Sequence, residues 1–191
     1  MALLDQLKKR RTRYDLNDNT PLGGEEITTL VRDVLREVPD AFNMQSQRAV
    51  ILYGDEHRKL WATVDEVFEG KIPADKIAMF SAGAASILFF TDEETIKGMQ
   101  EQVPDYAHNF PGWARESIGM AQYAVWTALA EAGIGASIQH YNPVIDNAVH
   151  EAFDIPAEWT LVSQMVIGGI GSEPGPIDKL DMNKRVLTRG A

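Results

Sequence analysis

The sequence predicts a mixed α+β fold, because segments with helical spacing and segments of strand length follow one another along its 191 residues. Apolar residues recur at i, i+3, i+4 and i+7 over 27–38 and again over 60–68, which is typical of amphipathic helices. The runs "AVILY" (49–53) and "SILFF" (86–90) are continuously apolar and of strand length. No GxGxxG segment follows a predicted strand, and this excludes a Rossmann-type sheet.

Each predicted helix has recognisable end signals. Glu25 and Glu26 lie in the first turn of the helix over 27–38, where the helix dipole favours anions, and Pro39 ends it. The acidic segment "TDEE" after the second strand opens a short helix. The longest helix is expected between Pro111 and Gly133, with alanines on one face that indicate close packing.

The last third of the chain predicts a strand at "ASIQHY" (136–141), a helix from Pro143 to about Phe153, and a strand over 159–169 with only partial alternation. A polar tail follows "GSEPGP" and contains Lys184, Arg185 and Arg189.

Composition places the chain among ordinary globular proteins, with 45% hydrophobic and 24% charged residues, and we expect a single domain over 1–191. The absence of cysteine excludes disulfides, thiolate nucleophiles and Cys-ligated metals, and the four histidines show no metal-ligand spacing. No secretory signal and no apolar run of about 20 residues is present, so we expect a cytoplasmic protein without a membrane contact. The net charge of -10 weighs against a nucleic-acid partner.

The basic segment "KKRRTRY" (8–14) stands out in so acidic a chain. It could be a solvated face, a binding site for a polyanion, or a binding site for one phosphate. Arginine matches phosphate oxygens with a planar fork and Thr12 adds a hydroxyl donor, so a single phosphate monoester is the better partner. Lys184 and Arg185 could converge on the same anion.

Two further segments gather polar side chains. Residues 38–52, "VPDAFNMQSQRAVIL", bring Asn43, Gln45 and their neighbours between a helix end and a strand, as a loop that caps its own backbone or as a site for a flat heterocycle. Residues 133–146, "GIGASIQHYNPVID", place Gln139 and His140 at a strand end, where a histidine is either structural or part of a site. No catalytic triad is apparent.

Together these stretches resemble the nitroreductase superfamily of flavoproteins. The motifs are "RRT", "PDAFNMQ" and "GIGASIQHYNP"; more narrowly, "FNMQSQR", "HRKLW", "ILFF", "NFPGWARESIGMAQYAVW" and "QHYNPVID" resemble its short branch, the fatty-acid-repression-mutant type. The resemblance covers residues 5–187. It implies a three-layer α/β/α sandwich with a mostly antiparallel central sheet, assembled as a homodimer with FMN in clefts between the subunits. The tail over 175–191 would contact the partner subunit.

The resemblance also implies site residues. Arg10, Arg11 and Thr12 would hold the FMN phosphate and ribityl chain, and Lys184 or Arg185 would complete the phosphate site. Asn43 and Gln45 would contact the ring and ribityl chain, and Gln139 and His140 would lie beside the ring nitrogen that takes the hydride. Lys8, Lys9 and Arg13 would be a solvated flank. Tyr14 departs from the family, which often has a second basic residue there.

The implied activity is reduction of nitroaromatic or quinone acceptors by NADH or NADPH in a ping-pong cycle, with the flavin carrying the chemistry and no metal or catalytic side chain needed. His108, Phe110 and Trp113 are candidates for the wall of the acceptor pocket. An FMN-binding regulatory or stress-response protein linked to fatty-acid signalling is the alternative. A nucleic-acid-binding N-terminal arm is a third reading, which predicts salt-dependent binding to polyanions.

Overall fold

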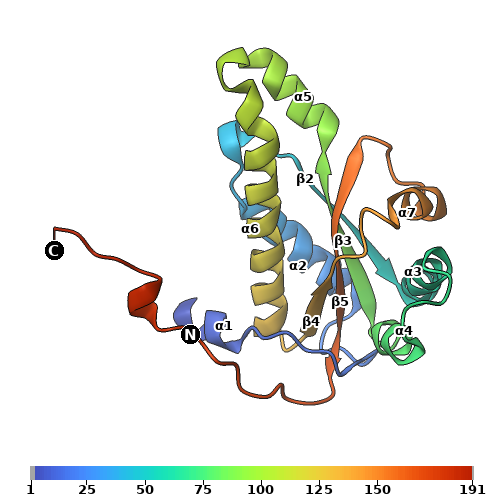
Figure 1. The fold of residues 1–191 in the computed structure, drawn as a ribbon. Coiled ribbons are helices and arrows are strands. Elements are labelled where there is room, and N and C mark those ends of the chain that lie inside the picture. The colour runs from blue at the N-terminus through green and yellow to red at the C-terminus, as the bar shows by residue number, and fades with distance from the viewer. Residues whose placement is uncertain (1–2, 191) are drawn as a thin grey trace.

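The computed structural model describes residues 3–190 and has three layers, with helices on both faces of one sheet (Figure 1). Every ladder between its five strands is antiparallel, in the order β1-β5-β3-β2, with β4 also paired to β5. The strands are β1 (Leu16–Asn17), β2 (Gln47–Tyr53), β3 (Ala85–Asp92), β4 (Gly135–Gln139) and β5 (Trp159–Ile170). This confirms the predicted α+β sandwich with a mostly antiparallel sheet.

Two apolar cores join the layers. On one face the sheet packs against α2 (Gly24–Glu37) and α6 (Phe110–Glu131), through side chains such as Ile27, Val31 and Val125. On the other face it packs against α3 (Gly54–Val67), α4 (Ala74–Ser81) and α7 (Asp146–Phe153), around Trp61 and Phe80. The helix α5 (Glu93–Gln102) follows β3 and packs beside the N-terminal end of α6.

The long periodic segments form the helices that the sequence predicts, and the two apolar runs form β2 and β3. The partial alternation over 159–169 has a simple cause, since β5 is buried on both faces from Ser163 to Gly169. The sequence did not indicate α1 (Leu3–Lys9), α4, or the two-residue strand β1. These elements are too short for a periodic pattern and are stabilised by packing.

Two predicted boundaries are wrong. The strand over 136–141 ends at Gln139, because the Tyr141 amide donates to the side-chain oxygen of Gln164 (2.9 Å) and leaves the ladder. The helix expected to open at Pro143 begins at Asp146, because the preceding residues form a turn closed by the bond from the Asp146 amide to the Pro143 carbonyl (3.2 Å).

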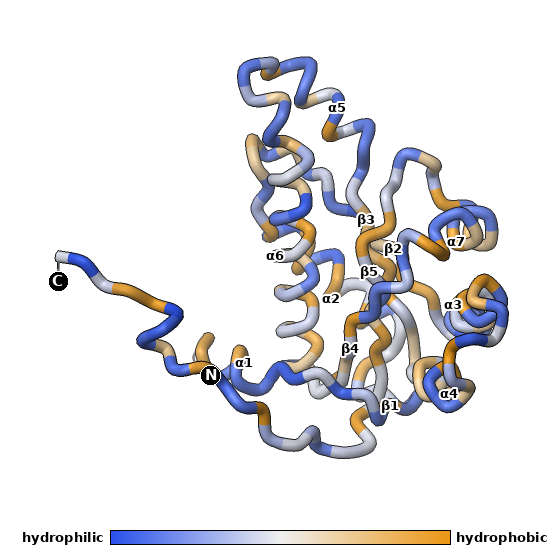
Figure 2. Tube along the Cα trace, in the orientation of Figure 1, coloured by the Kyte–Doolittle hydropathy of each residue, from blue (hydrophilic) through white to orange (hydrophobic). Residues whose placement is uncertain are grey.

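The C-terminal tail first runs along the basic segment and then leaves the body of the chain (Figure 1). The Gly171 amide donates to the Asp15 carbonyl (2.9 Å), and Arg13 and Arg11 donate to the Ser172 and Gly175 carbonyls. Beyond this point every residue described, through the short turn η3 (Met182–Lys184), is exposed. Figure 2 shows an apolar stretch on this arm, whose more than half-exposed apolar residues are Ile177, Leu180, Met182, Val186 and Leu187.

A buried histidine network joins α3 to β3. Trp61 Nε1 donates to Ser86 Oγ (3.1 Å), and the same hydroxyl forms a hydrogen bond with His57 Nδ1 (2.9 Å). The His57 side chain is completely buried. Burial lowers the pKa of His57 to about 4, the charge of Arg58 acts in the same direction, and the backbone at Phe80 and Ser81 opposes the shift only partly.

This network makes the fold sensitive to acid. Because the pKa of His57 is lower in the folded chain, unfolding takes up a proton between pH 6.5 and pH 4. Stability should therefore fall through this window, by up to about 3 kcal/mol at pH 4 from His57 alone. Urea unfolding at several pH values should show that the unfolding free energy of His57→Gln depends less on pH than that of the wild type. His108→Gln, at an exposed position, is the control and should keep the wild-type pH dependence. Loss of that dependence in His108→Gln would contradict the role given to His57.

Candidate functional site

The basic segment lies against the start of β4. Thr12 forms a parallel bridge with Ala136, and the Arg13 amide donates to the Ala136 carbonyl (3.0 Å). Gly135 permits this approach, because a Cβ atom there would lie 2.5 Å from Leu16 Cδ2 and 3.2 Å from Arg13 Cδ. The backbone thus carries Arg10, Arg11 and Thr12 to one end of β4.

Three N–H donors are buried here without an acceptor: Arg10 Nε, Arg11 Nε and Trp126 Nε1. Among residues 3–190, no carboxylate forms an ion pair with Arg10 or Arg11. A buried donor without a partner costs about 1–3 kcal/mol, and more when it belongs to a charged group. An anion with several oxygen acceptors would satisfy the two arginine donors, so Arg10 and Arg11 fit a phosphate group.

The other basic residues of the segment have different environments. Lys8 is exposed, 3.9 Å from Asp5, and Lys9 donates to the Glu131 carbonyl (3.3 Å) from an exposed position. Both agree with a solvated flank. The prediction is wrong for Arg13, whose side chain is only 10% exposed, because it pairs with Glu173 (2.9 Å) and so fastens the tail.

A cavity of about 470 Å³ opens beyond the other end of β4, a size within the range of small-molecule sites. His140 lines it from the strand end and is otherwise exposed, and Gln122 lines it from α6. Its remaining lining mixes polar and apolar side chains: Thr91, Glu93, Ile96, Pro111, Arg115, Asn142, Thr160, Leu161 and Val162. The sequence did not indicate Gln122, because a polar residue on a long helix gives no local signal.

The basic segment and this cavity are joined by β4 itself. Four residue steps separate Ala136 from His140, which corresponds to about 13 Å along a strand. Gln139 lies between them, and its amide nitrogen donates to Ser137 Oγ (3.2 Å). An elongated ligand with a phosphate at one end and a ring at the other could lie along this strand.

The predicted ring-binding loop is strained and firmly held. Phe42, Asn43 and Gln45 have φ values of 54°, 53° and 54°, a left-handed conformation that is costly for residues other than glycine. Asp40 stabilises the loop by accepting from the Ala41 amide (2.8 Å) and from the amide and hydroxyl of Ser46. The exposed side chains of Asn43 and Gln45 are therefore presented by a fixed backbone.

Arg48 also stabilises the loop before β2. Its guanidinium donates to the carbonyls of Gln45 (2.7 Å) and Gln47 (3.0 Å) and forms an ion pair with Asp92. Asp92 in turn caps α5 through the amides of Glu94 and Thr95. Burial would raise the pKa of Asp92, but the hydrogen bonds from Thr95 and the charge of Arg48 outweigh it, and the pKa is lowered.

The predicted pocket-wall residues form an aromatic cluster beside this loop. Trp113 is half-buried and its ring stacks on that of Phe42, 5.9 Å between centroids, while Tyr106 contacts both. Phe110 is fully buried and packs edge-on against Trp113, so it offers no surface to a bound molecule. His108 is exposed in the neighbouring turn η2 (Pro104–Asn109).

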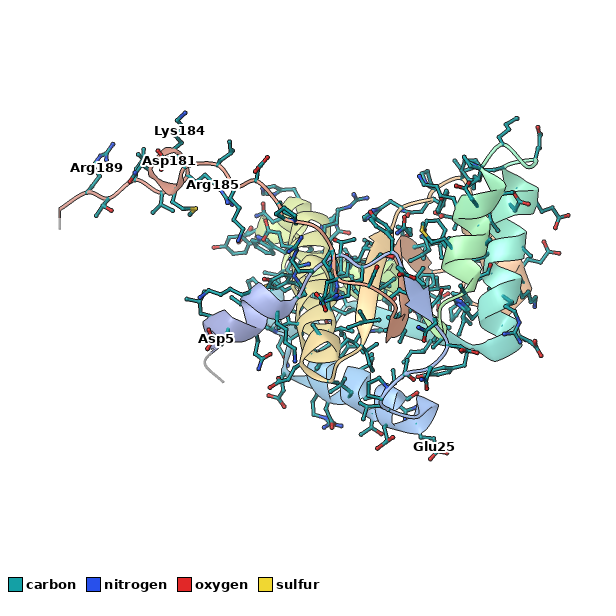
Figure 3. All side chains as sticks on the ribbon, turned by 90° about the horizontal axis from the view of Figure 1, so that it is seen from below. Asp5, Glu25, Asp181, Lys184, Arg185 and Arg189 are labelled. Carbon is teal, nitrogen blue, oxygen red and sulfur yellow. The ribbon has the colours of Figure 1, made fainter. Side chains whose placement is uncertain are left out.

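One chain does not bring all the predicted residues together. The loop contacts α6 near Ser117, where the Ser117 hydroxyl donates to the Pro39 carbonyl (2.8 Å), whereas the basic segment contacts α6 at Trp126. Nine residues of helix separate these points, about 13 Å. Lys184 and Arg185 lie on the exposed arm, away from the body of the chain (Figure 3).

The described residues also set limits. Within residues 3–190 no three histidine, aspartate or glutamate side chains gather where they could hold a metal ion. No helix in that range combines the length and the apolar composition needed to cross a bilayer.

The chain is thus an α+β protein with two unpartnered arginine donors near the start of β4 and a cavity beyond its other end. The family model described as "Nitroreductase family" matches residues 7–169, so the chain belongs to the nitroreductase family. It is accordingly an oxidoreductase of the nitroreductase type.

Individual relatives support the short branch that the sequence predicts. The nitroreductase FRM2 of Saccharomyces cerevisiae is 36% identical over 170 residues, which cover 86% of each chain. The nitroreductase CinD of Lactococcus lactis, solved with chloramphenicol, is 38% identical with a TM-score of 0.94, covering 98% of this chain and all of that one. A structure of CinD with 4-nitrophenol has a TM-score of 0.90 at 37% identity, with the same coverage.

The Arg48–Asp92 pair should contribute measurably to stability. Arg48→Met removes charge-assisted hydrogen bonds and leaves a nearly buried carboxylate unpaired, which should cost about 2 kcal/mol. The urea midpoint at neutral pH measures this loss. Arg36→Met is the matched control, because the side chain of Arg36 is 69% exposed and that of its partner Asp33 is 58% exposed. The loss of unfolding free energy in this variant should stay below about 0.5 kcal/mol. Equal losses in the two variants would refute the role of Arg48.

Proposed function

We propose that this protein is an FMN-dependent oxidoreductase that takes electrons from NADH or NADPH and passes them to a nitroaromatic or quinone acceptor. The observation that carries the proposal is the pair of buried, unpartnered donors Arg10 Nε and Arg11 Nε, which directly precede Thr12 in the chain and belong to arginines without a carboxylate partner. In a chain with a net charge of -10, two unneutralised arginines with buried donors indicate an anionic ligand.

FMN suits both ends of β4. Arg10, Arg11 and Thr12 would bind its phosphate, and Gln139 and His140 would lie along its ring at the edge of the cavity. When bound, FMN supplies hydride transfer from a nicotinamide donor to an acceptor. The chain's own residues orient the cofactor and leave one open position that donor and acceptor occupy in turn, which is the basis of a ping-pong cycle.

A nitroaromatic acceptor is supported by the relatives. Chloramphenicol and 4-nitrophenol, the compounds in the two CinD structures, both carry a nitrophenyl ring. Here the stacked rings of Phe42 and Trp113 would offer a flat apolar wall beside Asn43 and Gln45. His108 would lie at the rim of that wall.

We further propose that the site is completed in a homodimer. An apolar groove of about 780 Å³ runs along α6 between α1 and α2, and the exposed tail carries apolar side chains that have no cover in one chain. Burial of both against a second copy would remove this surface from water. The partner's loop could then bring Asn43 and Gln45 to the ring, and the tails could bring Lys184 or Arg185 to the phosphate.

An absorption spectrum of the purified protein tests the cofactor, and anaerobic addition of NADH tests the donor. We expect flavin absorption bands that correspond to about one FMN per chain and that bleach on addition of NADH or NADPH. A colourless protein that also fails to take up added FMN would overturn the proposal.

The regulatory alternative makes a different prediction about turnover. If FMN is sensory, added nitroaromatic or quinone should not raise NADH consumption above the rate seen with free FMN. Consumption well above that rate would support the enzyme and contradict the alternative.

Replacement of Arg11 tests the phosphate site. Arg11→Ala removes a charge-assisted hydrogen bond worth about 1.5–3 kcal/mol, so the Kd for FMN should rise by about 10- to 150-fold. Flavin retention on dilution and titration of flavin-free protein both measure this change. Lys8→Ala, which removes an exposed charge of the same segment, is the control and should keep full occupancy. Equal retention in Arg11→Ala and the wild type would remove Arg11 from the site.

A further inference from the structure

The guanidinium group of Arg10 lies over aromatic rings of α6. Its Cζ atom is 4.4 Å from the ring centroid of Trp126 and 5.5 Å from that of Tyr123. These two residues are three apart on the helix and so lie on the same face. Arg10 follows directly after α1, whose last turn donates through Lys9 to the Glu131 carbonyl at the C-terminal end of α6. The helix therefore supplies a platform for one particular cation of the basic segment.

The absence of a carboxylate partner distinguishes Arg10 from Arg13 and Arg48. Arg13 forms an ion pair with Glu173, and Arg48, whose Cζ atom is 5.7 Å from the ring centroid of Trp159, forms one with Asp92. A ring instead holds the flat face of the guanidinium and leaves the donors around its edge free. Arg10 Nε is buried and unpartnered, as this arrangement requires. Stacking orients a long, flexible side chain without neutralising it.

We propose that Trp126 is a positioning residue for anion binding, which stacks on Arg10 and aims its free donors at the phosphate of the flavin. The inference rests on the proposed function. Trp126 acts through Arg10, so its contribution belongs to the phosphate alone. The isoalloxazine ring, expected about 13 Å along β4, should be indifferent to it.

A comparison of two flavins isolates this contribution. Riboflavin has the ring and ribityl chain of FMN but lacks the phosphate. Titration of flavin-free, full-length protein with each flavin, followed by flavin fluorescence, gives the two Kd values. Trp126→Leu removes the aromatic platform and should raise the Kd for FMN about tenfold, as expected for loss of a partly buried cation–π contact. The Kd for riboflavin should stay within about twofold.

Two further variants separate stacking from other roles. Trp126→Phe keeps an aromatic face but lacks the indole N–H, and should retain most of the FMN affinity. Arg10→Met should weaken FMN binding, and the double variant Arg10→Met/Trp126→Leu should lose little more than Arg10→Met alone, because the two residues act as one unit. If Trp126→Leu does not fold, Trp126→Met gives the same comparison with a longer side chain.

The outcomes are distinct. Equal loss of FMN and riboflavin in Trp126→Leu would mean a structural role and would overturn the inference. If Trp126→Phe binds FMN as weakly as Trp126→Leu, the effect belongs to the indole N–H. If the losses add in the double variant, Trp126 does not act through Arg10. Either result would also overturn the inference. Failure of the wild type to bind FMN at all would refute the proposed function itself.

Discussion

The antiparallel pairing of β5 with β3, from Ala85 opposite Ile167 to Asp92 opposite Trp159, is the contact on which the other layers depend. Strands β1 and β4 also pair with β5, so this one strand positions β4, at whose two ends the basic segment and the cavity lie. Its residues 163–169 are buried on both faces, because helices cover both sides of the sheet. The apolar character of this strand is therefore a condition for the three-layer fold.

Electrostatics explains why the basic segment is tolerated in an acidic chain. Its cations have different environments. Lys8 is solvated near Asp5, Arg13 is paired with Glu173, and Arg10 lies over the ring of Trp126, while Lys9 and Arg11 donate to the carbonyls of Glu131 and Gly175. Only Arg10 and Arg11 keep buried donors without acceptors. Arg10 and Arg11 thus differ from their neighbours in keeping a free donor, although Arg11 also holds the tail through the Gly175 carbonyl.

Backbone strain is concentrated at the loop before β2. Three left-handed residues in four positions are held by Asp40 on one side and by Arg48 on the other. This cost is reasonable for a segment that must present side chains in a fixed direction. The loop and the basic segment contact α6 at separate places, and the proposed homodimer would also cover the exposed apolar groove and tail.

The sequence by itself determined the elements whose cause is local. The periodic stripes of α2 and α6, the apolar runs of β2 and β3, and the motifs of the nitroreductase family are all contained in short stretches, and each was predicted. Only the tertiary structure decided what depends on distant partners. The end of β4 at Gln139 depends on Gln164, the difference between Arg13 and Arg10 depends on Glu173 and Trp126, and Gln122 reaches the cavity only because α6 crosses the sheet there. Residue spacing along a chain carries information about local backbone geometry, whereas the neutralisation, burial and orientation of a side chain depend on residues that are distant in the sequence.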